Sequence, residues 1–258
     1  MALRQQVAQG RIYVSHDEHA VLNHLGQPIG PSLPEWSPPP LPVREVLTGR
    51  CCRLEPLEAR RHVESLFTAN AHDPEGRMWT YLPYGPFTGL DSYREWAEAA
   101  STSSDPLFFA IIEMASERAV GIASYLRITP GSGSIEVGHL AYSPLLQRTP
   151  AATEAIYLLM ERAFTLGYRR FEWKCDALNV PSRKAAQRLG FSYEGLFRQA
   201  TVYKGRSRDT AWYAAIDAEW PALQAAFRQW LAPENFDTEG RQRLRLSELT
   251  RPLLHRLG

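Results

Sequence analysis

Hydrophobic residues between positions 50 and 231 follow two different periods. Segments in which apolar side chains recur every three or four residues indicate helices, whereas alternating or short continuous apolar segments indicate strands. The helical spacing predicts helices at 57–70, 91–100, 150–165, 179–190 and 219–231. The strand patterns predict strands at 50–57, 107–112, 119–128, 135–142, 170–176, 199–204 and 208–216.

The order of these elements predicts an α/β fold built on a mixed sheet. Three strands follow one another before the helix at 150–165, and a hairpin that turns at Gly205 closes the core. No G-x-G-x-x-G follows a strand, and no G-x-x-x-x-G-K-[ST] occurs. The pattern therefore does not indicate a doubly wound nucleotide-binding fold.

The stretch at 135–165 is the part around which the rest of the chain is expected to be organised. Thr149 is a suitable N-cap for its helix, and Pro150 suits the first helical position. Ala151 and Ala152 follow with small side chains and free amides, and no capping box is present. A bare helix N-terminus of this kind can bind a phosphate or pyrophosphate. An ordinary strand–turn–helix connection is the alternative.

The two ends of the chain differ in composition from its middle. Residues 1–44 form a Pro/Gly-rich arm, 45–217 are expected to form the main domain, and 218–258 an added helix with a polar surface tail. Trp36 is expected to anchor the arm on the domain or on a neighbouring subunit. Anchoring on a neighbouring subunit would make the protein a homodimer. A flexible tail is the alternative.

The loop at 73–89 carries several aromatic residues among prolines and glycines. These rings cannot all face solvent without cost, so they pack on the domain or line a cleft. We predict that Trp79, Tyr81 and Tyr84 belong to the rim of a substrate pocket, with plain loop packing as the alternative.

The composition narrows the class of protein. The 258 residues are 44% hydrophobic and carry a net charge of +1, so a sizeable core is expected and nucleic acid is not an expected partner. The three cysteines, Cys51, Cys52 and Cys175, offer no disulfide framework, which favours a reducing compartment. Because no signal core or membrane span is evident, we expect a cytoplasmic protein without a membrane partner. His62 has no second ligand at metal spacing, and no metal is expected.

Three segments in order resemble one known family. They are the strand, loop and helix at 136–164, the segment Asn179…Ser182…Leu189-Gly190-Phe191, and 193–198 leading to a hairpin with Asp209. Together they resemble the GNAT superfamily of acyl-CoA-dependent N-acetyltransferases, and within it the branch of ribosomal-protein N-terminal alanine acetylases (RimJ/RimL). The resemblance spans about 46–217 and implies acetyl-CoA as donor and a primary amine as acceptor.

The resemblance places the donor pyrophosphate at the start of the helix at 150–165. The family loop reads Gln/Arg-x-x-Gly-x-Gly/Ala, and the matching residues are Gln147, Pro150 and Ala152. A proline thus replaces the first glycine and removes one amide donor, but the helix dipole remains. The amides left to bind phosphate are those of Arg148, Thr149, Ala151, Ala152 and Thr153.

Two further donor contacts are implied where the helix at 179–190 begins. Asn179 matches the residue that commonly bonds the pantetheine or acetyl group in the family, and Ser182 is a second contact. A helix cap is the alternative for both residues, and the two interpretations are compatible.

The strand at 136–143 matches the family strand whose bulge opens a gap for the pantetheine arm. A backbone N–H near His139 and Leu140 is expected to stabilise the oxyanion, and Glu136 and His139 are the candidate general bases. In a regular strand these two side chains lie on opposite faces, and a bulge between them would change that.

The general acid and the acceptor stay open at this point. The position of the family's tyrosine acid is Ala186 here, and Tyr193 and Tyr203 are substitutes. We expect direct transfer of the acetyl group to a small-molecule amine or a peptide N-terminus. The alternative is an acyl-CoA-binding sensor or scaffold without turnover, which Pro150 and the missing tyrosine motivate.

Overall fold

The computed structural model describes residues 21–258, so the predictions for residues 1–20 lie outside the described part. The described residues divide into two units, 21–37 and 38–258. In the first unit, β1 (Val21–Leu22) and β2 (Pro28–Ile29) form a small antiparallel hairpin. Its turn is held by Asn23, whose side-chain oxygen accepts the backbone N–H groups of Leu25 and Gln27.

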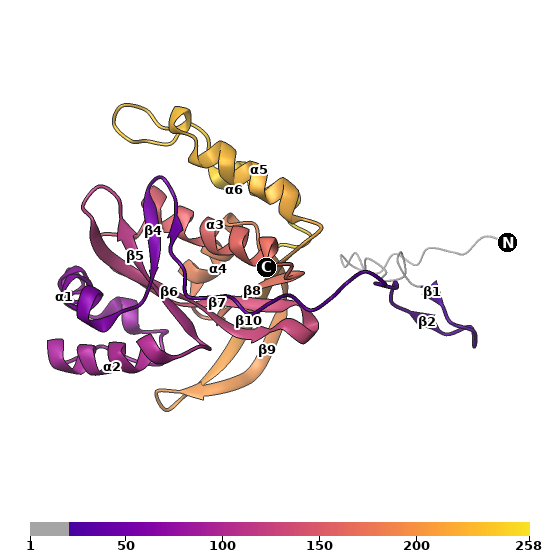
Figure 1. Cartoon of the computed structure of the whole chain (residues 1–258), viewed down its shortest axis with the longest axis horizontal. Helices are drawn as coiled ribbons and strands as arrows, with labels where there is room; N and C mark the ends of the chain where they lie inside the picture. The colour runs from indigo at the N-terminus through magenta and orange to yellow at the C-terminus, as the bar shows by residue number, and fades with distance from the viewer. Residues whose placement is uncertain (1–20) are drawn as a thin grey trace. The chain divides into compact units, whose positions relative to one another are not determined.

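The second unit is built on an eight-stranded sheet in the order β3-β4-β5-β6-β7-β8-β10-β9 (Figure 1). Its strands are β3 (Leu47–Thr48), β4 (Cys52–Pro56), β5 (Leu107–Glu113), β6 (Arg118–Thr129), β7 (Ser134–Tyr142), β8 (Arg170–Asp176), β9 (Ser192–Tyr203) and β10 (Arg206–Ile216). The β7–β8 pair is parallel and the other pairs of this sheet are antiparallel. The mixed α/β fold predicted from the sequence is therefore confirmed.

Helices cover both faces of the sheet, and Figure 1 shows α1 and α2 on one side and α3 and α4 on the other. The helices are α1 (Ala59–Asn70), α2 (Leu90–Thr102), α3 (Pro150–Thr165), α4 (Val180–Arg188), α5 (Trp220–Leu231) and α6 (Leu246–Thr250). Short 3₁₀ helices are η2 (Arg77–Trp79), η3 (Pro130–Ser132), η4 (Pro233–Asn235) and η5 (Arg251–Leu253). None of the helices in residues 21–258 is both long and apolar enough to cross a membrane.

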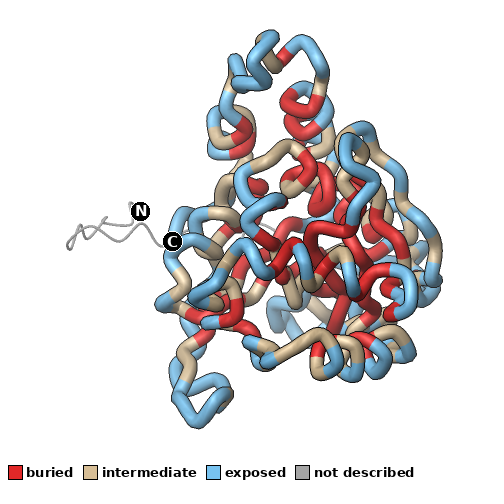
Figure 2. Tube along the Cα trace, turned by 90° about the vertical axis from the view of Figure 1, so that its left-hand side faces the viewer, coloured by how far each residue is buried: buried red, intermediate tan, exposed pale blue. Residues whose placement is uncertain are grey.

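Two hydrophobic clusters, one on each face of the sheet, make the core. Figure 2 shows the buried segments of the chain gathered in the interior. Alternation along each strand assigns its side chains to the faces, as in β5, where Phe109 belongs to the α3 face and Phe108 to the α1–α2 face. The α1–α2 helices cover β5 and β6, and no such cover is recorded over β8 and β10 within the described residues. On the α1–α2 side, η2 contacts β7, the strand that carries Glu136 and His139.

The structure corrects three details of the predicted elements. Helix α3 was expected to bury one face, but ten of its sixteen residues are buried, because α5 covers its outer side. Strand β9 begins at Ser192 instead of 199, since residues 192–198 alternate too weakly in hydrophobicity to indicate a strand. The tail after Ala232 was expected to lie on the surface, yet Leu246 and Thr250 are fully buried. Burial of a leucine such as Leu246 contributes about 2 kcal/mol, so the tail is part of the folded core.

Candidate active site

The parallel strands β7 and β8 separate partway along their length. They pair only over Ser134–Val137 and Arg170–Trp173, so the second half of β7 has no strand partner on its β8 side. In a sheet, the backbone groups of such a stretch point into the gap and need another partner. The family resemblance implied a gap at this strand, and the gap lies beside the N-terminus of α3, which follows β7 in the chain.

A β-bulge in β7 accompanies this separation. Ser124 pairs with Gly138 and Ile122 with Ala141, so His139 and Leu140 together oppose one residue of β6. His139 adopts a φ of 51°, a left-handed conformation that is costly for a residue with a side chain. This strain is located at the position where the resemblance predicted an oxyanion-stabilising amide.

The bulge settles the orientation of His139. Its imidazole stacks on Tyr84 at 5.5 Å between ring centroids and lies 5.1 Å from the ring of Phe108. Both neighbours belong to the α1–α2 face of the sheet, which is also the face of Glu136. The extra residue has therefore moved His139 to the same side as Glu136, in contrast to a regular strand.

His139 is a neutral imidazole at physiological pH. Burial, with a smaller contribution from the charge of Arg127, lowers its pKa to about 4. Its Nδ1 atom is buried without a hydrogen-bond partner among residues 21–258. A left-handed backbone conformation at a buried titratable residue is a feature that clusters at functional sites.

Glu136 is enclosed in an ion-pair network. Its carboxylate lies 2.7 Å from Arg127 Nη1 and 2.9 Å from Lys174 Nζ, and its side chain is only 3% exposed. Burial raises the pKa of Glu136, and the two cations oppose that shift. Lys174 also pairs with Glu172 at 2.6 Å and lies over the Trp212 ring at 3.7 Å. Sequence reasoning missed Lys174, although its alternation with Trp173 places it on the Glu136 face.

The start of α3 is capped as the sequence predicted, but fewer amides are free. Thr149 Oγ1 accepts the N–H of Ala152 at 3.2 Å, and the N–H of Thr149 itself bonds the Leu146 carbonyl. Two of the five amides expected to bind phosphate therefore already have partners. Arg148, at φ 64°, and Ala151 have no recorded backbone partner among the described residues. Gln147 donates its side-chain N–H to the Tyr142 carbonyl, which holds the turn before the helix.

At the start of α4, Asn179 caps the helix, whereas the Ser182 hydroxyl bonds a tryptophan of β8. Asn179 Oδ1 accepts the N–H of Ser182 at 3.1 Å, and Ser182 Oγ accepts Trp173 Nε1–H at 3.0 Å. The cap interpretation of Asn179 is thus correct, and its contact with a donor stays a prediction. Ala186 is fully buried in the core, so a tyrosine at this position would not fit without repacking.

Residues of the aromatic loop approach the gap from the α1–α2 side. Tyr84 borders it through its stack on His139, and Tyr81 Oη donates to the Leu178 carbonyl at 3.3 Å. Trp79 is 5% exposed and lines a hollow of about 310 Å³ with Phe87 and Tyr93. Part of the loop therefore packs on the domain, and part of it lies next to the gap. The substrate role of Trp79, Tyr81 and Tyr84 stays a prediction.

The β9–β10 hairpin reaches the gap from the opposite side. Tyr203 Oη donates to Asp176 Oδ2 at 2.9 Å, at the end of β8. Burial and this carboxylate raise the pKa of Tyr203 to about 12. Lys204 Nζ donates to the Trp79 carbonyl at 2.7 Å, which ties the hairpin to the aromatic loop. Of the two substitute acids, Tyr203 is thus held at the strand end next to the gap.

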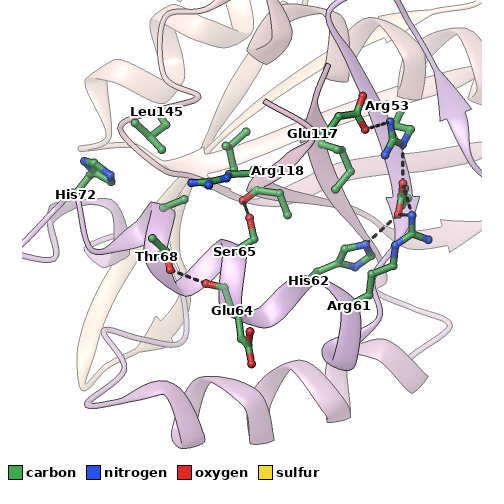
Figure 3. Close-up of a pocket in the computed structure, with 15 residues that line it drawn as sticks. Arg53, Arg61, His62, Glu64, Ser65, Thr68, His72, Glu117, Arg118 and Leu145 are labelled. Atoms are coloured by element: carbon green, nitrogen blue, oxygen red, sulfur yellow. Dashed lines mark hydrogen bonds and ion pairs between the residues drawn. The ribbon is translucent and has the colours of Figure 1, made fainter. Parts of the chain in front are cut away.

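A separate hollow of about 430 Å³ lies between α1 and the first residues of β6 (Figure 3). His62, for which the sequence shows no second ligand at metal spacing, is buried at its edge and bonds Glu55 Oε2 through Nε2 at 3.0 Å. Its Nδ1 accepts the N–H of Glu58, and Arg53 and Arg61 pair with Glu55. None of the predicted site residues lines this hollow.

Known proteins share both the sequence and the fold of this chain. The acetyltransferase (GNAT) domain family matches residues 52–192. The crystal structure of a GCN5-related N-acetyltransferase from Brucella melitensis is 47% identical, covers 85% of this chain and 100% of its own, and superposes with a TM-score of 0.83. An uncharacterized N-acetyltransferase, p20, of Bacillus licheniformis is 28% identical over 57% of this chain and 84% of its own length.

The branch suggested by the sequence is also represented. RimL, a ribosomal L7/L12 alpha-N-protein acetyltransferase solved in complex with coenzyme A, covers 67% of this chain and 99% of its own with a TM-score of 0.58. At 22% identity this likeness shows the fold alone. From the match over residues 52–192 and the shared fold, the chain belongs to the GNAT family of acetyltransferases.

Proposed function

We propose that the protein transfers the acetyl group of acetyl-CoA to a primary amine by direct attack within a ternary complex. The observation that carries this proposal is the gap between β7 and β8, which opens beside the capped N-terminus of α3. A helix N-terminus attracts phosphate, and a strand with unpaired backbone groups can bond an extended pantetheine arm.

The residues around the gap fit such a donor. Arg148 and Ala151 offer amides at the positive end of α3, where the pyrophosphate would bind. Asn179 lies at the other wall of the gap, after β8, and its amide nitrogen is available because the cap uses only the oxygen. The amide of Leu140, in the bulge, would stabilise the negative charge that develops on the acyl oxygen.

His139 is the better candidate for the general base. Its imidazole is uncharged at neutral pH, so one ring nitrogen keeps a lone pair that can accept a proton from the attacking amine. Glu136 is on the same face, but Arg127 and Lys174 hold its carboxylate as an ion pair. We assign Glu136 to keeping the two cations in place, and Tyr203 to protonating the departing thiolate.

A thiol-release assay tests the proposal. Acetyl-CoA is offered with a panel of small amines, amino acids and peptides with free N-termini, and CoA binding is measured separately by calorimetry. Release with at least one amine supports the transferase. Tight CoA binding without release for any amine would instead support the sensor or scaffold, and absence of CoA binding would contradict both.

A further inference from the structure

Arg188, the last residue of α4, connects both predicted donor helices with the C-terminal extension. Its Nη1 donates to Thr153 Oγ1 in α3 at 3.0 Å, and its guanidinium carbon lies 5.1 Å from the ring centre of Trp230 in α5. Its carbonyl accepts the hydroxyl of Thr250 in α6 at 3.0 Å. One side chain thus touches the helix that begins at the phosphate-binding turn.

The guanidinium of Arg188 forms no ion pair within the described part of the chain. Among residues 21–258, no Asp or Glu forms an ion pair with it, and burial is the only recorded influence on its pKa, which is lowered. Arginines that are largely removed from water normally have an anionic partner, because an uncompensated cation is costly there. The neighbouring carboxylate, Glu154, accepts the N–H groups of residues 50–52 instead. Arg188 therefore lies beside α3 with hydrogen-bond and aromatic contacts but without a carboxylate partner among the described residues.

We propose that Arg188 supplies positive charge to the phosphate groups of the donor bound at the N-terminus of α3. The inference rests on the proposed function, since it names a further group of the same donor site. Thr153 is four residues beyond the cap Thr149, which places it about 6 Å along the helix axis. Arg188 acts through the field at this turn and through its bond to Thr153, and is therefore a positioning residue.

The proposal also gives the C-terminal extension a role in donor binding. The family match ends at residue 192, whereas Trp230 and Thr250 belong to the extension. These two residues hold the side chain and the carbonyl of Arg188, respectively. The extension thus fixes an arginine of the family domain in an orientation that the domain alone does not secure.

Calorimetric titration of the full chain with CoA tests this inference. Arg188→Met and Arg188→Gln remove the charge, and the glutamine keeps a hydrogen-bond donor for Thr153. Arg188→Lys keeps the charge. The matched control is Arg228→Met, because Arg228 also bonds α3 from the extension, through Tyr157 and Glu161, but in later helical turns. Pantetheine, which lacks phosphate, serves as a second ligand.

We expect both neutral variants to bind CoA about five- to tenfold more weakly, as for loss of one favourable charge near a helix terminus. The lysine variant and the Arg228 control should stay within about twofold of wild type, and pantetheine binding should not change. The salt dependence of CoA affinity should be shallower in the neutral variants, and the KM for acetyl-CoA should rise without a change in kcat.

Equal CoA affinity in wild type and both neutral variants would overturn the inference. A loss that is the same for CoA and pantetheine would also overturn it, since it would show distortion of the helices and not a phosphate interaction. If the wild-type protein binds no CoA, the donor site itself is absent, and the proposed function fails together with this inference.

Discussion

The two buried histidines, His62 and His139, lie on the same face of the sheet in opposite situations. Burial lowers the pKa of both. His62 has a partner for each ring nitrogen, the N–H of Glu58 and the carboxylate of Glu55. His139 is stacked between Tyr84 and Phe108, on a strained backbone, with Nδ1 unpartnered among the described residues. Complete hydrogen bonding fits the structural role of His62, and incomplete bonding leaves the His139 ring free for the role of base that we propose.

The largest expected effect concerns His139. We expect His139→Gln to lower kcat by about 100- to 1000-fold, the usual contribution of a general base. Its free energy of unfolding should fall by about 1–2 kcal/mol, because the ring loses its contacts with Tyr84 and Phe108 but no recorded hydrogen bond. Steady-state kinetics with acetyl-CoA and the best amine, beside thermal unfolding, measure both. A variant with full kcat would remove His139 as the base.

The reverse substitution tests the other histidine. We expect His62→Leu to lower the free energy of unfolding by about 2–3 kcal/mol, because the Glu58 N–H loses its acceptor and Glu55 loses a donor. The kcat of the folded variant should equal that of wild type. Urea denaturation and the same kinetic assay check this. A fall in kcat without a loss of stability would show that His62 acts in the reaction and not in the structure.

Both histidines should make the free energy of unfolding depend on pH. Since their pKa values are depressed in the folded protein, the unfolded chain binds more protons as the pH falls below about 6.5. The free energy of unfolding should therefore decrease from that pH downward, and for His139 until the pH passes about 4. His139→Gln should reduce the slope of the free energy of unfolding against pH by up to about 1.4 kcal/mol per pH unit. Unchanged slopes would contradict the depressed pKa of His139.

Glu136 gives the smallest expected effect on turnover. Because its carboxylate is paired with Arg127 and Lys174, we expect Glu136→Gln to change kcat by less than about fivefold. Its free energy of unfolding should fall by about 1–3 kcal/mol, since two cations lose part of their compensation. A loss of kcat comparable to that of His139→Gln would make Glu136 the base instead.

The periodicity of apolar residues was enough to predict the helices and strands, but not the contacts between them. Helix α3 and strand β8 occupy the predicted ranges, since their apolar residues recur at regular intervals. The gap beside β7 followed from a resemblance, and only the backbone shows that the bulge turns His139 to the Glu136 face. Lys174 and Arg188 gain their partners from strands and helices distant in the chain. Such ion pairs and contacts depend on the tertiary fold and leave no local pattern.

The bonds of Glu154 also bear on the order in which the chain folds. Its carboxylate accepts N–H groups of residues 50–52, about one hundred positions earlier, and a side chain at Gly49 would overlap it. Contacts this distant in sequence carry a high loop-closure entropy and are expected to form after the folding transition state. The turn between β3 and β4 should then close late, and Gly49→Ala should speed unfolding far more than it slows refolding.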